Sequence, residues 1–200
     1  MIAILDYGSG NLRSALRAFE STGRKVTLTS DPEVALNATG LVVPGVGAFA
    51  SCMAGLLKIN GDQIIKNRIA SGKSIFGICV GMQILFDSGT ENSNTSGVGA
   101  VSGVVESLDA PVLPHMGWNN LKVTGQSRIF NGVEDESFYF VHSYAVKDWS
   151  ESSLDATAVT NYHGDFLAAF EKGPIMATQF HPEKSGAAGL KLISNWVSGL

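Results

Sequence analysis

The sequence predicts an α/β fold: a three-layer, mostly parallel central sheet flanked by helices, with antiparallel strands in the second half. Up to about residue 86, short apolar runs of β-branched residues alternate with stretches of helical period. That alternation is typical of βαβ units and a parallel sheet. From about residue 99, apolar runs are separated by turn residues with little helical periodicity between them. We therefore expect antiparallel pairing there.

Four strands and three helices are expected in the first half. The strands are expected at residues 1–6, 25–29, 41–43 and 74–78, and the helices at 11–21, 49–71 and from 81 to about 86. The strand at 74–78 is almost wholly apolar, which favours the buried middle of a sheet. The strand at 41–43 is expected to stop at Pro44, because proline has no N–H for a ladder. Residues 87–99 are polar and indicate a mobile loop, to which we assign no chemistry.

The second half is expected to contain strands and one final helix. The strands are expected at 99–107, 120–124, 137–146, 156–162, 165–170 and 175–180. Residues 161–165 form the expected hairpin connection, with His163 and Gly164 near its tip. The final helix covers about 187–197, and its period places Leu190, Ile193 and Trp196 on the inner face.

Length and composition narrow the class of protein. The chain has 200 residues and 44% hydrophobic content, which predicts one folded domain over residues 1–200. Its net charge of −4 gives no basic footprint for nucleic acid or an anionic membrane surface. No run approaches the roughly 18 apolar residues of a membrane span, and the first residues do not resemble a signal peptide. Two cysteines suit a reducing compartment, so we expect a cytoplasmic protein.

The segment Gly77-Ile78-Cys79-Val80-Gly81 lies where an apolar strand meets a helix. Flanking glycines permit a sharp turn, and such a nucleophile elbow projects its side chain and turns the following N–H toward an oxyanion. A helix N-terminus beside the sulfur also favours the thiolate. The alternative is a buried structural cysteine. We assign that structural role to Cys52, which lacks flanking glycines.

A second segment, Gln179-Phe180-His181-Pro182-Glu183, follows an apolar strand. In extended backbone His181 and Glu183 share a face, so the carboxylate could bind one ring nitrogen while the other accepts the thiol proton. A surface salt bridge is the alternative. A third segment, Pro44-Gly45-Val46-Gly47, lies at the carboxyl end of a parallel strand, where ligands bind. It could present an N–H to an oxyanion, or it could be a plain turn.

These segments together resemble the class I glutamine amidotransferases. The resemblance rests on the elbow continued through Met82-Gln83 and on His181-Pro182-Glu183. Within the class, further blocks resemble the glutaminase subunits of imidazole glycerol phosphate synthases. These blocks are Leu5-Asp6-Tyr7-Gly8-Ser9-Gly10-Asn11-Leu12, Pro44-Gly45-Val46-Gly47-Ala48-Phe49, Pro114-His115-Met116-Gly117-Trp118-Asn119, Phe140-Val141-His142-Ser143-Tyr144 and Gln179 to Gly186. They follow one another through nearly the whole chain.

The resemblance implies a Cys-His-Glu triad of Cys79, His181 and Glu183 that hydrolyses glutamine to glutamate and ammonia. It implies oxyanion donors on the backbones of Val46 and Val80. It also implies a glutamine site formed by Gly47, Gln83, Ser143 and Tyr144. In this family the ammonia passes to a (β/α)₈ barrel, the cyclase subunit, so the resemblance implies a heterodimer in histidine biosynthesis. It further implies low glutaminase activity without that partner.

Candidate partner contacts also come from the resemblance: Asn11, Trp118, Asn119 and Lys184. Other roles stay open for three of them, because Asn11 could cap a helix, Trp118 could be core and Lys184 could be a solvated charge. His115 and His142 are interpreted as structural hydrogen-bonding residues.

Other functions stay open at this point. The chain could serve another class I amidotransferase, such as those of anthranilate or pyridoxal phosphate synthesis, or be a non-catalytic module of this fold. A thiol redox protein would need a resolving cysteine, and Cys52 and Cys79 lack the Cys-x-x-Cys spacing. The scattered histidines and cysteines form no metal-ligand pattern, so neither a metal nor a cofactor is expected.

Overall fold

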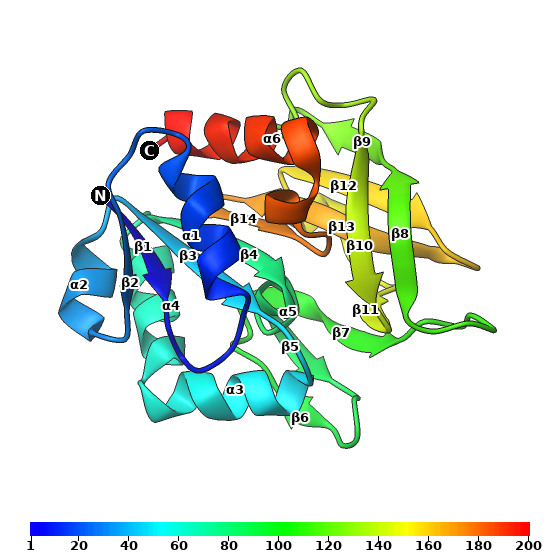
Figure 1. Cartoon of the computed structure of the whole chain (residues 1–200). Coiled ribbons are helices and arrows are strands. Elements are labelled where there is room, and N and C mark those ends of the chain that lie inside the picture. Colours follow the sequence, from blue (N-terminus) through cyan, green and yellow to red (C-terminus); the bar gives the residue numbers. More distant parts are fainter.

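An eight-stranded mixed sheet forms the centre of the molecule (Figure 1). In the computed structural model, which describes residues 1–200, the strand order is β2-β1-β3-β4-β14-β13-β12-β9. The strands from β2 to β14 are parallel, and the remaining pairings are antiparallel. The strands are β1 (Ile2–Leu5), β2 (Val26–Thr29), β3 (Gly40–Gly45), β4 (Ser74–Cys79), β9 (Lys122–Gly125), β12 (Ala156–Asn161), β13 (Asp165–Lys172) and β14 (Ile175–Thr178).

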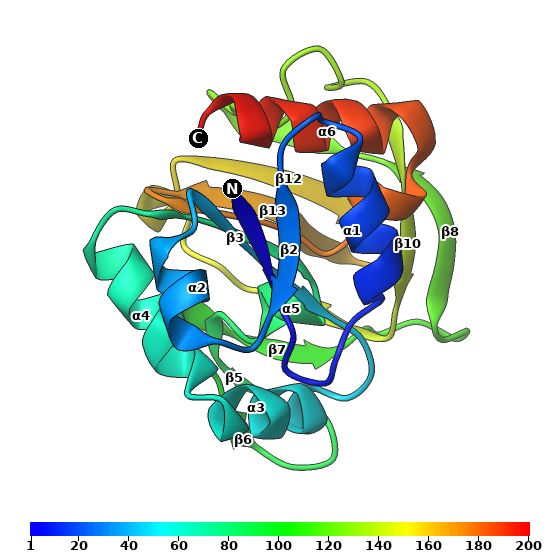
Figure 2. The ribbon, with the colours of Figure 1, turned by 60° about the vertical axis from the view of Figure 1, so that its left-hand side comes forward.

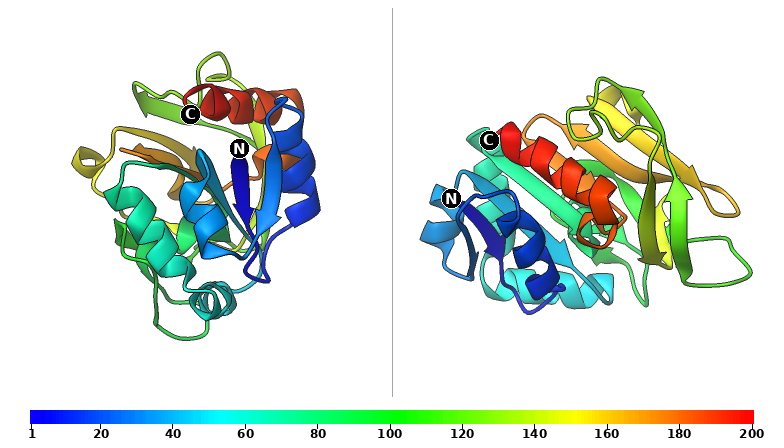
Figure 3. Two further views of the ribbon diagram at one scale, coloured as in Figure 1. Left: turned by 90° about the vertical axis from the view of Figure 1, so that its left-hand side faces the viewer. Right: turned by 45° about the horizontal axis from the view of Figure 1, so that its top comes forward.

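Helices cover both faces of this sheet, so the molecule has three layers. Helices α1 (Leu12–Glu20) and α6 (Gly186–Ser198) lie on one face (Figure 2). Helices α2 (Pro32–Asn37), α3 (Phe49–Lys58) and α4 (Gly61–Ala70) lie on the other, and the two termini are near each other (Figure 3). The predicted α/β fold class is therefore confirmed. None of the helices is long and apolar enough to cross a membrane.

Two smaller sheets complete the fold beside the antiparallel half. One has the order β11-β7-β5-β6, and the other pairs β8 with β10. The strands are β5 (Phe86–Gly89), β6 (Thr95–Ser96), β7 (Val101–Ser107), β8 (His115–Asn120), β10 (Ser137–His142) and β11 (Tyr144–Val146). Three short helical turns remain: α5 (Val80–Gln83), η1 (Glu151–Ser153) and η2 (Pro182–Lys184).

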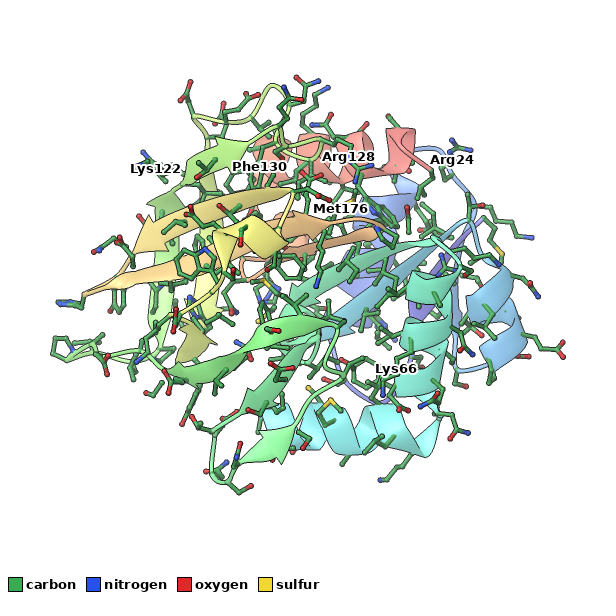
Figure 4. All side chains as sticks on the ribbon, turned by 180° about the vertical axis from the view of Figure 1, so that it is seen from behind. Arg24, Lys66, Lys122, Arg128, Phe130 and Met176 are labelled. Atoms are coloured by element: carbon green, nitrogen blue, oxygen red, sulfur yellow. The ribbon has the colours of Figure 1, made fainter.

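The core lies between the central strands and the helices. Every residue of β3 is buried, and so is β4 apart from its first residue, as expected for strands covered on both faces. Phe19 of α1, Phe76 of β4 and Trp196 of α6 meet edge to face or tilted, with ring centroids 5.4–6.1 Å apart. In Figure 4, which shows the molecule from behind, Arg128 and Phe130 lie near α6. Phe130 packs there on Phe138, which ties the segment after β9 to β10.

The structure corrects several predicted elements. Strand β3 continues through Pro44, because parallel pairing with β4 at that point does not use the proline nitrogen. The helix expected over 81–86 is only α5, since the chain turns into β5 at Phe86. Residues 87–99 contain parts of β5 and β6 rather than a plain loop, and α2 was not predicted. Leu190 is 41% exposed, whereas Ile193 and Trp196 are buried as expected.

Candidate active site

Cys79 occupies a sharp turn between β4 and α5. Its backbone has φ +56° and ψ −115°, which is unusual for a residue with a side chain. The glycines beside it leave no room for a Cβ: one on Gly81 would lie 1.8 Å from the Val43 carbonyl oxygen. One on Gly77 would lie 2.9 Å from the Gly81 oxygen. The predicted elbow is therefore present and is held by close backbone packing.

His181 and Glu183 form a buried pair beside this turn. Nδ1 of His181 lies 2.8 Å from Oε1 of Glu183, and both side chains are 3% exposed. The two residues meet across the short turn η2, where Pro182 is the first residue, rather than along extended backbone as predicted. The Ser185 hydroxyl donates to the His181 carbonyl oxygen at 2.7 Å and accepts from the Tyr139 N–H at 3.0 Å. These contacts fix the His181 backbone against β10.

The His181 ring is adapted to carry a proton. Burial disfavours the charged ring, but hydrogen bonds to Cys79 and Glu183 and their negative charges raise the pKa of His181 to about 9. Because its Nδ1 faces Glu183, the Nε2 atom is left for the thiol. The imidazolium beside a thiolate is the arrangement that a cysteine nucleophile requires.

A cavity of about 410 Å³ opens onto the Cys79 sulfur. The residues predicted to form the glutamine site all line it, together with several neighbours. The lining residues are Val46, Gly47, Ala48, Cys79, Val80, Gln83, Glu91, Val141, His142, Ser143, Tyr144, His181 and Lys184. The structure thus brings together the triad cysteine and histidine, both predicted oxyanion residues and four predicted substrate contacts.

Glu91 is a cavity residue that the sequence analysis missed, because it lies in the stretch to which no chemistry was assigned. Its Oε2 atom accepts a hydrogen bond from the Phe49 N–H at 2.8 Å, at the start of α3. That bond anchors the carboxylate at the cavity wall. An acidic residue in a polar loop carries no local signal of this role, since only the fold brings residue 91 to residue 49.

The backbone N–H groups of the two predicted oxyanion donors differ in their hydrogen bonding. Val80 begins α5, and the first N–H groups of a helix have no partner within it. The Val46 N–H instead donates to the Ser9 hydroxyl at 3.1 Å, and that hydroxyl donates to the Val46 carbonyl at 2.9 Å. Cys52, buried as expected, contacts the same carbonyl at 3.4 Å. The Val46 N–H is therefore bound by a residue outside the cavity wall.

The candidate partner residues differ in their surroundings, and only Lys184 lines the cavity. Asn11 caps α1, accepting from the Ser14 N–H at 3.4 Å. Trp118 is 57% exposed on β8, which excludes a core role. The Asn119 side chain donates to the Asn161 carbonyl at 3.0 Å, and Lys184 is exposed at the cavity mouth. Met116, 62% exposed, shares a face of β8 with Trp118.

The comparisons with known proteins identify the family of the chain. The family model "Glutamine amidotransferase class-I" matches residues 3–198. The chain therefore belongs to the class I glutamine amidotransferases. Among solved structures, one described as "Crystal structure of glutamine amidotransferase" has a TM-score of 0.77 and 18% identity, covering 100% of this chain and 99% of that one. The "Structure of PurLQS from Thermotoga maritima" has a TM-score of 0.75, 18% identity and 99% and 97% coverage, so both show the shared fold.

Curated relatives are more specific and cover the whole chain. The chain is 55% identical to "Imidazole glycerol phosphate synthase subunit HisH" of Thermobifida fusca (strain YX), over 100% of this chain and 98% of that protein. The subunit of the same name from Mycobacterium tuberculosis (strain ATCC 25618 / H37Rv) is 54% identical with the same coverage. The one from Corynebacterium glutamicum is 52% identical over 98% of this chain and 97% of that protein.

Proposed function

We propose that this protein is the glutaminase subunit of an imidazole glycerol phosphate synthase. It hydrolyses glutamine and delivers ammonia to a cyclase subunit in histidine biosynthesis. The observation that carries the proposal is the buried Cys79, His181 and Glu183 group at one cavity, in a chain 55% identical to such subunits along its length. The two free cysteines suit the reducing cytoplasm that we propose as its compartment.

In the proposed reaction the Cys79 thiolate adds to the carbonyl carbon of the glutamine side-chain amide. The protonated His181 gives its proton to the amide nitrogen, the C–N bond breaks, and ammonia leaves. Water then adds to the thioester while His181 takes a proton from it, the C–S bond breaks, and glutamate departs. Glu183 orients the ring through Nδ1 and stabilises its charge in both steps.

The cavity offers complementary groups for a free amino acid. Glu91 supplies a carboxylate for the substrate ammonium, and Lys184 supplies a cation for its carboxylate. Gln83 donates both N–H groups of its amide to the protein, which leaves its Oε1 atom for a substrate N–H. Ser143, Tyr144 and Gly47 complete the proposed glutamine site.

The oxyanion site requires a change at Val46 in this proposal. The Val80 N–H is available, but the Val46 N–H is bound to Ser9 and must turn before it can meet the oxyanion. Gly45 and Gly47 flank this peptide, and Gly47 already has φ +89°, so the backbone can rearrange at low cost. We therefore propose slow hydrolysis by the chain alone.

The proposed partner is a (β/α)₈ barrel cyclase that forms a heterodimer with this chain. An exposed apolar surface supports a protein contact beside the cavity: Trp118 and Met116 on β8, with Leu113 and Val112 just before it, are 40–65% exposed. Asn11, Asn119 and Lys184 are proposed polar contacts of the same interface.

The test is glutamine hydrolysis measured as glutamate release. It should be assayed for the chain alone, with a cyclase subunit, and with that cyclase loaded with its nucleotide substrate. We expect stimulation of at least about 10-fold in the loaded complex. Cys79→Ala should lower the stimulated rate by about 10³-fold or more while the fold persists. Full activity without the partner, or none with it, would point to another amidotransferase or to a module without chemistry.

A further inference from the structure

Gln179 provides a second contact to the Cys79 sulfur, apart from the triad. It follows β14 directly and is 1% exposed. Its Nε2 atom donates to the Cys79 Sγ atom at 3.7 Å, within the usual range for a nitrogen donor on sulfur. Gln179 does not line the cavity, so a bound substrate leaves this contact in place.

Gln83 fixes the orientation of the Gln179 amide. The Gln83 Nε2 atom donates to the Gln179 Oε1 atom at 2.9 Å and to the Tyr144 carbonyl oxygen at 2.8 Å. An amide nitrogen carries two hydrogens, and these two bonds use both. Since the Gln179 oxygen is thereby held toward Gln83, its NH₂ group must face the sulfur.

Two buried histidines extend the hydrogen-bond network from the Tyr144 carbonyl oxygen, which His142 contacts directly and His115 contacts through His142. His142 Nδ1 lies 3.0 Å from the Tyr144 oxygen, and because a carbonyl only accepts, Nδ1 carries the hydrogen. Burial lowers the pKa of His142 to about 3, so its ring is neutral and Nε2 accepts. His115 Nδ1 donates to that atom at 3.1 Å, and its ring stacks on Tyr162 with centroids 4.1 Å apart.

We propose that these residues form a hydrogen-bond relay, His115 to His142 to the Tyr144 carbonyl to Gln83 to Gln179, that holds an N–H donor on the Cys79 sulfur and stabilises its thiolate. A donor on a charged acceptor is roughly twice as strong as one on a neutral group, so the contact strengthens when the thiol loses its proton. The inference rests on the proposed nucleophilic role of Cys79. Gln179 acts on the reacting sulfur, and the other members are positioning residues.

The relay starts on β8, the strand that also carries Trp118 (Figure 1). It therefore runs through five residues from the buried face of β8, opposite the exposed Met116 and Trp118, to the proposed nucleophile. The other titratable groups near Cys79 are His181, Tyr7 and Cys52, together with His142, Glu91 and Lys184, which line the cavity. All of them are retained when Gln179 is replaced.

The main test is Gln179→Met, which keeps the size of the side chain and removes the donor. The rate of Cys79 alkylation by iodoacetamide, followed by mass spectrometry of the Cys79 peptide, should fall by about 10-fold at neutral pH. In the stimulated complex kcat should fall by more than KM for glutamine rises, because Gln179 lies outside the glutamine site and reaches it only through its bond to Gln83. Gln63→Met, an exposed replacement on α4, should change neither value.

A second variant protects the test against misfolding. If Gln179→Met does not fold, Gln179→Glu keeps the acceptor for Gln83 and replaces the donor by a carboxylate. It should slow alkylation further, because it places a negative charge beside the sulfur. An alkylation rate equal to that of the unchanged chain in the folded variant would overturn the relay, even where Cys79→Ala proves that Cys79 is the nucleophile.

The far end of the relay is tested by His115→Phe, which keeps the stacking on Tyr162. Loss of this donor should slow Cys79 alkylation by about 3-fold, since it acts on the sulfur through four intervening groups. In the Gln179→Met background the same replacement should have no further effect. An equal additional loss in that background would show that His115 acts by a different route.

Discussion

The two sides of the active-site cavity differ in how firmly their backbone is held. Around Cys79, backbone packs against backbone so closely that Gly81 accepts no side chain. Around Val46, one serine hydroxyl holds the peptide between two glycines, and the Val46 side chain is 42% exposed. The proposed nucleophile is thus fixed in place before glutamine binds, whereas the proposed second oxyanion donor is held by hydrogen bonds that can be exchanged.

This difference indicates which side of the cavity a partner could alter in order to change the rate of glutamine hydrolysis. A substitution that distorts the elbow should also destabilise the fold, because the residues of the elbow pack in the hydrophobic core beside the paired strands β3 and β4. A change at the Ser9 contact alters only which hydrogen bonds the Val46 peptide makes. Regulation by a partner is therefore expected on the Val46 side and not on the Cys79 side.

The largest expected effect comes from Gly81→Ala, which disrupts the close backbone packing on the Cys79 side of the cavity. Its Cβ would lie 1.8 Å from the Val43 carbonyl oxygen, so strand or helix must move. The free energy of unfolding should fall by more than about 3 kcal/mol, and glutamine hydrolysis should be lost. Urea unfolding measures the first effect. Gly199→Ala, with its nearest atom 3.5 Å away, is the control and should change stability little.

The next effect concerns pH and the His181 ring. Its pKa is raised from an ordinary value of 6.5 to about 9, so the folded chain holds this proton more tightly than the unfolded chain. The resulting stabilisation is complete below about pH 6.5 and is lost as pH rises through about 9, by on the order of 1–3 kcal/mol. Urea unfolding across this window should show the loss.

Glu183→Gln should flatten that pH dependence, because it removes the negative partner of the imidazolium. His163→Asn, at the exposed hairpin tip, should leave it unchanged. A pH dependence that persists fully in Glu183→Gln would show that another group titrates in this range.

The smallest expected effect comes from Ser9→Ala, which removes hydrogen bonds from the backbone on the Val46 side of the cavity. Without the hydroxyl, the backbone at Val46 loses both of its bonds to Ser9 and keeps only the Cys52 contact to its carbonyl oxygen. Hydrolysis by the chain alone should rise by about 5-fold, the equivalent of one ordinary hydrogen bond. Ser198→Ala on α6 serves as the control. A rate that stays level or falls in Ser9→Ala would show that Ser9 does not restrain the oxyanion donor.

Sequence patterns predicted much of this molecule, because local rules decide those parts. The alternation of apolar strands and helical periods placed the parallel strands β1 to β4, and the glycines around Cys79 indicated the elbow. The parallel pairing of β14 with β4 was not predicted, because antiparallel pairing was expected throughout the second half. The Cys-His-Glu group was predicted from the resemblance to a known family, because the residues alone left a structural cysteine and a surface salt bridge open. The three-layer arrangement follows from strands that must be covered on both faces.

What could not be predicted depends on contacts between distant segments. Glu91 reaches the cavity only because β5 and β6 fold its loop against α3, and Gln179 meets Gln83 across 96 positions of the chain. The Ser9 contact to Val46 spans 37 positions and involves a common surface residue type. Leu190 fits the helical period, yet the neighbouring elements leave it exposed. Periodicity describes one helix and not what packs against it.

The Ser9 hydroxyl has a consequence for the balance between the two proposed subunits. If the Val46 N–H must leave Ser9 before hydrolysis, a molecule of this chain without its partner consumes glutamine only slowly. A cell that makes this chain in excess would then lose little nitrogen to futile hydrolysis, and the two genes would not need to be expressed in equal amounts.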